Sequence, residues 1–171
     1  MKKSILKLVM LGAFIMSAQF AHAQNYQKGD NLLNLGIGVG GSLGLPIGLS
    51  YEIGFSDKIS GGIYAGYSSK TQNVVIADWK WTHIMGAARA SYHFNFNVDK
   101  LDPYVGVMLG YNYAKGKWSN GGGAGWPEPT AGGVIYGGHA GARYMFSNKM
   151  GVFAEVGYGI GNLNAGITFK L

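Results

Sequence analysis

Cysteine is missing from all 171 residues, so the chain has neither a disulfide framework nor a thiolate site. Charge is scarce as well. Asp, Glu, Lys and Arg make up 13% of the chain, about half of the ~25% that is typical of a soluble domain. No apolar run after residue 24 reaches the roughly 20 residues that a membrane-spanning helix needs. These shortages argue against a disulfide-stapled domain, an ordinary soluble domain and a helical membrane protein.

Clustered positive charge is also absent. The net charge of +6 falls to +3, or 11 basic residues against 8 acidic ones, when Lys2, Lys3 and Lys7 are set aside. No basic stripe remains that would suggest nucleic acid as a partner. The histidines lack the spacing of metal ligands, and the GxG triplets lack the strand–turn–helix context of a nucleotide site. We therefore expect no nucleic acid, no metal and no cofactor.

The first 23 residues have the three parts of a secretory signal peptide. Lys2 and Lys3 form a positive start, residues 8–16 form an apolar stretch, and Ala21-His22-Ala23 is an A-x-A-like cleavage site. The apolar stretch is too short to span a membrane. The sequence predicts a cleavable Sec-type signal peptide over residues 1–23 and a single mature domain over residues 24–171.

Glycine is abundant in the mature domain, and the residues around it alternate in polarity. The chain has 30 glycines, well above the usual ~7%. Segments of about ten residues with alternating apolar and polar positions are the signature of a transmembrane β-barrel. We count eight, at 31–40, 46–55, 59–68, 79–94, 104–113, 134–146, 151–159 and 163–171. The fold prediction is all-β: an eight-stranded antiparallel up-and-down transmembrane barrel.

The two faces of these segments differ in a way that favours a membrane. The polar face is mostly Gly, Ser, Asn and Thr, and most lysines fall in the predicted connections. A soluble exterior carries many more charges. We therefore expect the apolar face to meet lipid and the polar face to line the lumen. The connections after the second, fourth and sixth segments then face the periplasm, as do both termini. The longer connections at 69–78 and 114–133 face the outside, as do the short links at 41–45 and 160–162.

Charged side chains on the predicted inner face need partners, because a small barrel is filled by its own side chains. The predicted internal polar network consists of Glu52, Arg89, His93, His139, Arg143 and Glu155. The sixth and seventh predicted strands, at 134–146 and 151–159, form a hairpin over a short turn. If Phe146 lies opposite Val152 in this hairpin, Arg143 lies directly opposite Glu155. Glu52 and Arg89 form a second predicted pair, reaching across the lumen. We interpret this network as polar side chains that fill the lumen, and not as a catalytic site.

The longest connection, KGKWSNGGGAGWPEP, carries the predicted exposed contacts Lys115, Lys117, Trp118 and Trp126. It is either a plain mobile loop or a contact site for another surface. Two other functions stay open. One is a narrow pore through the lumen. The other is a lipid-modifying enzyme, for which Asp78, His83 and the serines at 68 and 69 would supply a nucleophile–His–acid set at the outer rim.

The C-terminal part carries a family resemblance. GARYMFSNKMGVFAEVGYG followed by LNAGITFKL resembles the penultimate hairpin and closing strand of the small OmpA/OmpX-like outer-membrane β-barrel proteins, and the resemblance extends over roughly residues 28–171. It implies an eight-stranded barrel in the cell outer membrane, in contact with outer-membrane lipids. It also implies recognition of the closing strand by the barrel-assembly machinery, although this chain ends in Leu171 with the aromatic Phe169 two residues earlier.

The family implies no single activity, since its members are linked to adhesion, envelope integrity, resistance to host defence or lipid modification. We expect a monomer with a structural or surface-interaction role, acting through its extracellular loops. The expected partner of these loops is a ligand on another surface. No catalytic residue of the lipid-modifying members carries over to this sequence.

Overall fold

The computed structural model describes residues 26–41, 44–74, 77–96, 98–118 and 128–171. The predicted signal peptide at 1–23 and Trp126 lie outside these ranges. Among the described residues, no helix is long and apolar enough to cross a membrane.

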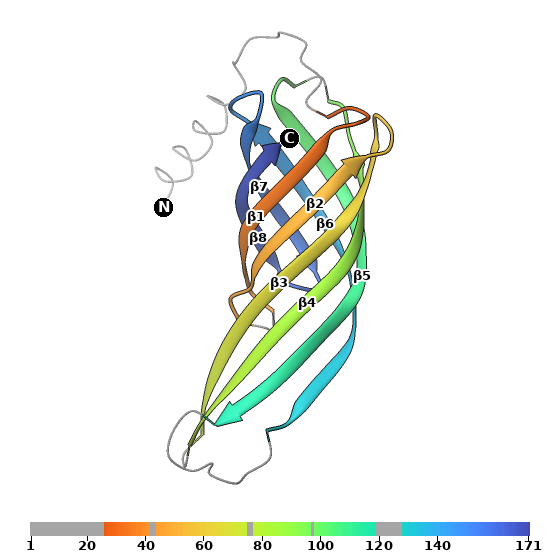
Figure 1. Ribbon diagram of the computed structural model, residues 1–171. Helices are drawn as coiled ribbons and strands as arrows, with labels where there is room; N and C mark the ends of the chain where they lie inside the picture. Colours follow the sequence, from red (N-terminus) through yellow and green to blue (C-terminus); the bar gives the residue numbers. More distant parts are fainter. Residues whose placement is uncertain (1–25, 42–43, 75–76, 97, 119–127) are drawn as a thin grey trace, which may run out of the picture.

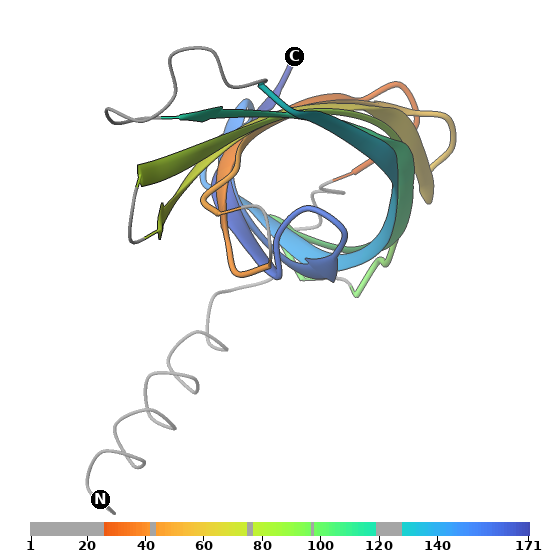
Figure 2. The same cartoon turned by 90° about the horizontal axis from the view of Figure 1, so that it is seen from below.

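Eight antiparallel strands form a closed barrel, as predicted (Figures 1 and 2). Each strand pairs with the next, and β8 pairs with β1 to close the ring. Both described ends of the chain lie at the same end of the barrel (Figure 1). The strands are β1 (Asn31–Val39), β2 (Ile47–Gly54), β3 (Ile59–Val74), β4 (Ala77–His93), β5 (Leu101–Trp118), β6 (Thr130–Met145), β7 (Met150–Tyr158) and β8 (Leu163–Lys170).

The middle four strands are longer than predicted. β3 to β6 have 16 to 18 residues, whereas the other four have 8 or 9. At roughly 3.3 Å per residue, they reach about 25 Å further. The predicted connections at 69–78 and 114–133 are therefore wrong over much of their length, because the strands continue there. Their polarity changes, and the prediction took that change for the end of a strand.

We call this extension the projection: residues 68–74 of β3, 77–83 of β4, 112–118 of β5 and 130–137 of β6. β2 ends beside Tyr67, and β7 ends beside Gly138. Beyond these points β3 to β6 continue as a four-stranded sheet (Figure 1, bottom). The remainder of the barrel is the body. Because the longer connections of such barrels face the outside, we assign the projection to the extracellular side.

In the body the predicted orientation of the two faces is confirmed. Large apolar side chains point outward, such as Ile63 and Val107, which are 65% and 64% exposed. Polar and charged side chains point inward and are buried. The outward apolar surface is what a hydrocarbon environment requires.

Glycines on the inner face make room for large lumen side chains. A Cβ on Gly36 would lie 2.7 Å from the Phe153 ring, and one on Gly66 would lie 2.7 Å from the Tyr64 ring. Real Cβ atoms do not approach this closely. The high glycine content therefore lets a narrow barrel hold aromatic rings flat against its wall.

Candidate functional site

The lumen gathers all six side chains that the sequence analysis assigned to its interior. They are between 0% and 9% exposed, and they come from β2, β4, β6 and β7, which bring them to a common level of the barrel. They are Glu52, Arg89, His93, His139, Arg143 and Glu155.

The pairing predicted for Arg143 and Glu155 is wrong. In the β6–β7 hairpin Tyr144, not Phe146, lies opposite Val152, so the register differs by two residues. Arg143 consequently pairs with Phe153, and Glu155 pairs with Gly141. A shift of two keeps every side chain on its face, which is why both residues still point into the lumen. Each forms its ion pair with a different partner.

Arg143 binds two carboxylates at the centre of the cluster. Its Nη2 lies 2.7 Å from Glu52 Oε1, and its Nη1 lies 3.2 Å from Asp102 Oδ2. Its Nε donates to Asn34 Oδ1 at 3.3 Å, and its guanidinium carbon lies 4.0 Å from the centre of the Tyr104 ring. A buried guanidinium needs such a set of acceptors, because it loses its hydration.

Glu155 is held by Arg89 and a tyrosine. Arg89 Nη2 lies 2.6 Å from Glu155 Oε1, and the Tyr104 hydroxyl donates to the same oxygen at 2.8 Å. Arg89 Nε also lies 3.4 Å from Glu52 Oε1, which is the cross-lumen pair that the sequence suggested. Glu155 is thus the second acid of a four-residue chain that links Arg143, Glu52, Arg89 and Glu155.

Sequence reasoning missed several members of the network, Asp102 above all. His93 Nδ1 lies 2.7 Å from Asp102 Oδ1, and Ser60 and Ser91 donate to Glu52 Oε2 at 2.9 and 3.2 Å. The segment predicted over 104–113 does not include Asp102. Asp102 lies two residues before Tyr104, so the period-two alternation of the strand puts both on the inner face of β5.

The periplasmic mouth is covered by the segment before β1. The Tyr26 ring stacks on His93 with centroids 3.5 Å apart and planes 6° apart, and Tyr26 is only 5% exposed. Burial raises the pKa of its hydroxyl to about 12. Asp30 binds Lys170 Nζ at 2.7 Å, which ties the segment to the closing strand. The network is therefore shielded from the periplasm.

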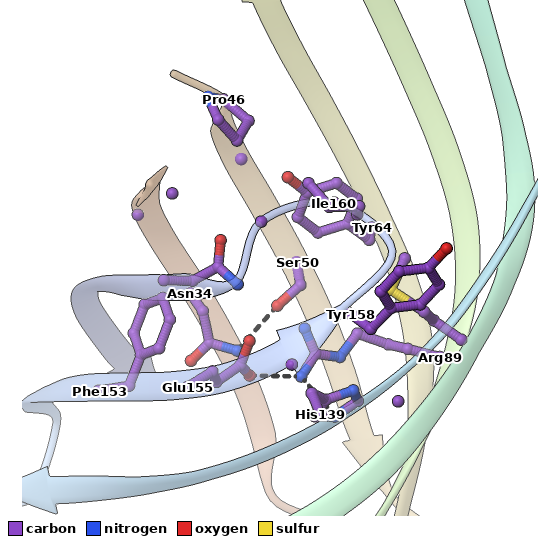
Figure 3. Close-up of a pocket in the computed structure, with 18 residues that line it drawn as sticks. Asn34, Pro46, Ser50, Tyr64, Arg89, His139, Phe153, Glu155, Tyr158 and Ile160 are labelled. Carbon is purple, nitrogen blue, oxygen red and sulfur yellow. Dashed lines mark hydrogen bonds and ion pairs between the residues drawn. The ribbon is translucent and has the colours of Figure 1, made fainter. Parts of the chain in front are cut away.

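On the other side of the network the lumen holds a small cavity of about 40 Å³ (Figure 3). Arg89, Glu155 and His139 line one part, and Tyr64 and Pro46 line another (Figure 3). A water molecule needs about 10–15 Å³ by this kind of measure, so the cavity has room for a few waters and for no larger solute. Taken with the buried ion pairs, this makes the body a filled cylinder.

Three of the predicted exposed contacts, Lys115, Lys117 and Trp118, lie on β5 in the projection, and the fourth, Trp126, lies outside the described residues. Lys115 and Lys117 are on β5, with Nζ 2.7 and 3.7 Å from Glu128 carboxylate oxygens. The hydrogen bond from Lys115 lowers the pKa of Glu128. Trp118 is half-buried, with its ring at 89° to the Trp79 ring and 4.2 Å between centroids, so it is less exposed than the sequence suggested.

The outer part of the projection reverses the polarity of the body. There the outward face carries Lys80, Lys115 and Lys117, so it lies in water rather than in hydrocarbon. Nearer the body the outward face stays apolar, with Tyr113, Val134 and Tyr136 exposed. The concave face carries the three described tryptophans and His83, and Lys70 of β3 lies opposite Trp81 on the same face.

The rim set proposed for catalysis is not assembled. Asp78 and His83 are five residues apart on β4, which places them on opposite faces of the strand. His83 Nδ1 instead lies 3.2–3.3 Å from the side-chain amide of Asn112. Ser68 is buried and lies opposite His83 in the register.

Comparison with known proteins agrees with this geometry. Residues 8–169 match the model of the family described as outer membrane protein beta-barrel domain. The chain therefore belongs to that family and is a protein of the outer membrane. Comparison with curated proteins found no match.

Solved structures show the same fold. The N-terminal β-barrel domain of OprF from Pseudomonas aeruginosa has a TM-score of 0.56 at 16% identity, covering 84% of this chain and 98% of that one. Neisserial surface protein A has a TM-score of 0.54 at 17% identity, covering 83% and 95%. A de novo designed transmembrane β-barrel has a TM-score of 0.53 at 14% identity, covering 85% and 98%. At these identities the likeness concerns the fold.

Proposed function

We propose that this protein is a surface-interaction barrel, in which a rigid body anchors the projection outside the membrane. One observation carries the proposal. Beyond Tyr113 the outward face of the projection is polar and its concave face is aromatic, which is the pattern of a sheet that packs one side against a partner and leaves the other in water. Aromatic side chains held in water without such a role are costly and uncommon on a small protein.

The filled lumen supports an anchoring role for the body. Its ion pairs join β2, β4, β5, β6 and β7 across the barrel, so relative movement of these strands would break charge pairs that are buried. A filled body holds the projection at a fixed height and orientation. The same filling argues against the narrow pore, and the separated rim residues argue against the lipid-modifying enzyme.

The test is a variant without the projection. The β3–β4 hairpin would be closed by a short turn joining Ser68 to His83, and the β5–β6 hairpin by one joining Ala114 to Ala131, because these residues are paired in the register. Barrel folding is checked by the heat-dependent gel shift of the purified protein. Cells that produce either form are compared for attachment to coated surfaces, and purified proteins are compared for conductance in planar bilayers.

We expect the shortened barrel to fold, to lose attachment and to conduct no more than the full chain. Attachment equal to that of the full chain would overturn the proposal. A conductance from the full chain that Glu155→Gln alters would replace it with the pore. A change of outer-membrane lipid mass that depends on the protein would replace it with the enzyme.

A further inference from the structure

The concave face of the projection contains a hollow that nothing above assigns. It has a volume of about 540 Å³, within the ~300–1,000 Å³ range of small-molecule sites. Trp81 and His83 of β4 line one side of it, and Asn112 of β5 lies beside them. Ile135 of β6 and Gly159, which follows β7, complete the lining at the end nearer the body.

Small residues form the floor of the hollow. Ala114 and Ala131 lie opposite each other in the β5–β6 register, and Gly133 lies opposite Asn112. Because these side chains end at Cβ or before it, the backbone amides and carbonyls of the floor lie close to the surface. A flat ligand can therefore approach the strands closely.

The aromatic wall is held in place by its neighbours. The Trp79 ring lies 5.7 Å from the Trp81 ring and 4.2 Å edge-on from the Trp118 ring. It also covers Gly116, where a Cβ would lie 2.7 Å from the indole. Trp81 and His83 continue the row, with their centroids 6.5 Å apart. This row presents ring faces with restricted motion, and such faces bind flat ligands at little entropic cost.

Polar groups stand beside the wall. The His83 imidazole uses Nδ1 toward Asn112, which leaves its second ring nitrogen, Nε2, on the other side of the ring. The Asn112 amide carries both a donor and an acceptor. No Lys, Arg, Asp or Glu lines the hollow itself, and the nearest charged position in the register is Lys70 of β3, opposite Trp81 on the same face. The lining therefore combines stacking surface with neutral hydrogen-bonding groups.

These features identify the chemistry of the ligand. A pyranose ring has an apolar C–H face, which packs on an indole, and hydroxyls around its edge, which bond to amides and imidazoles. Lipid is disfavoured because the other face of the same strands carries exposed lysines. A folded protein is disfavoured because a stable interface buries about 800 Å² on each partner, more than this hollow offers.

Resting on the proposed function, we propose that the hollow binds a neutral sugar unit of a glycan presented by another surface. Trp81 stacks on the ring of the sugar. His83 and Asn112 bond its hydroxyls, and the small-residue floor accommodates its edge.

The experiment uses the full mature chain in a detergent without a sugar headgroup, because glucoside and maltoside detergents would compete. Methyl α-glucoside, methyl β-galactoside and N-acetylglucosamine are titrated separately. Of the four tryptophans of the chain, Trp79, Trp81 and Trp118 lie on the projection, and Trp126 falls in the connection between β5 and β6. No tryptophan therefore belongs to a strand of the body, and indole fluorescence does not report on the lumen. Saturation-transfer NMR then identifies the sugar protons that contact the protein.

We expect at least one sugar to bind and Trp81→Ala to weaken that binding about tenfold or more, as is typical for loss of a stacking partner. Asn112→Ala should weaken it less. The matched control is Lys80→Ala, one residue away on the opposite face, which should leave binding unchanged. NMR serves as the readout for Trp81→Ala, since that change also removes a fluorophore.

Absence of binding by all three sugars would overturn the proposal, as would equal losses in Trp81→Ala and Lys80→Ala. Failure here is distinguishable from failure of the proposed function. If the shortened barrel loses attachment while Trp81→Ala keeps it, the projection is an interaction surface but the sugar site is wrong. If a surface protein is captured in a Trp81-dependent way and no sugar binds, the partner is a protein instead.

Discussion

The body and the projection are built from the same four strands, yet their two faces have opposite chemistry. In the body, Arg89 on β4 points into the filled lumen, while its neighbour Ala88 faces outward. Further along β4, Trp81 occupies the inward position and Lys80 the outward one. The alternation of period two continues without a break. Outside the barrel, hydrocarbon surrounds the body and water surrounds the outer part of the projection. The outward positions change from apolar to charged accordingly, and the inward positions change from charged to aromatic.

The comparison separates two roles for charge. The charged side chains in the lumen of the body are buried and form ion pairs with one another, so removing one leaves its partner buried and unpaired. Projection charges, such as Lys117 and Glu128, are exposed and screened by water. A charge removed from the body should therefore cost stability, whereas one removed from the projection should not.

Arg143→Met should destabilise the body most. It leaves Glu52 and Asp102 buried without their central cation, and breaking a buried pair in this way costs about 3–5 kcal/mol. The measurement is urea unfolding in lipid vesicles followed by far-ultraviolet circular dichroism, because no tryptophan belongs to a strand of the body.

The double variant Glu52→Gln/Arg143→Met is the control for this prediction. It removes an acid together with the cation, so its loss should be smaller than that of Arg143→Met alone. A loss of less than about 1 kcal/mol in the single variant, within the range of ordinary surface changes, would show that the ion pairs do not hold the body together.

Glu155→Gln should have an intermediate effect of about 1–3 kcal/mol. The amide can still accept from Arg89 and Tyr104, but it carries no charge, so Arg89 retains only its longer contact with Glu52. The same unfolding experiment measures the loss. Phe153→Leu, at an inward position of the same strand, serves as a control for packing without a change of charge. If Glu155→Gln leaves the free energy of unfolding unchanged, Glu155 does not contribute to the stability of the ion-pair network.

The sequence was sufficient to predict the barrel, the strand number and the face on which each network residue lies. Those conclusions depend on period-two alternation, which is a local property of the chain. Of the two predicted ion pairs, Glu52–Arg89 is present, but the partners of Arg143 were not accessible in the same way. The actual partner of Arg143 is Glu52, 91 residues away, and its position across the lumen depends on the stagger of the closed barrel.

The projection was missed for a different reason. Outward apolar positions stop after Tyr67 and Tyr113, and the prediction took that as the end of the strands. The alternation itself continues through Trp79, Lys80 and Trp81, with the polarity reversed. The predicted segment 79–94 already includes these three residues, and a rule that follows the period rather than the sign of the apolar face would have extended β5 in the same way. The register of the β6–β7 hairpin failed because a shift of two residues preserves both faces.

Glu128→Gln should have the smallest effect, with no measurable change in unfolding. Its partners Lys115 and Lys117 are exposed, and exposed pairs of this kind contribute little. The pKa of Glu128 is lowered below its usual 4.5. Any contribution is therefore present above that usual value and disappears as the pH falls through the lowered one. Tryptophan emission during unfolding at neutral and acidic pH, with and without added salt, measures it at the projection. A loss as large as that of Glu155→Gln would mean that this pair is shielded from water, and the contrast between body and projection would then not hold.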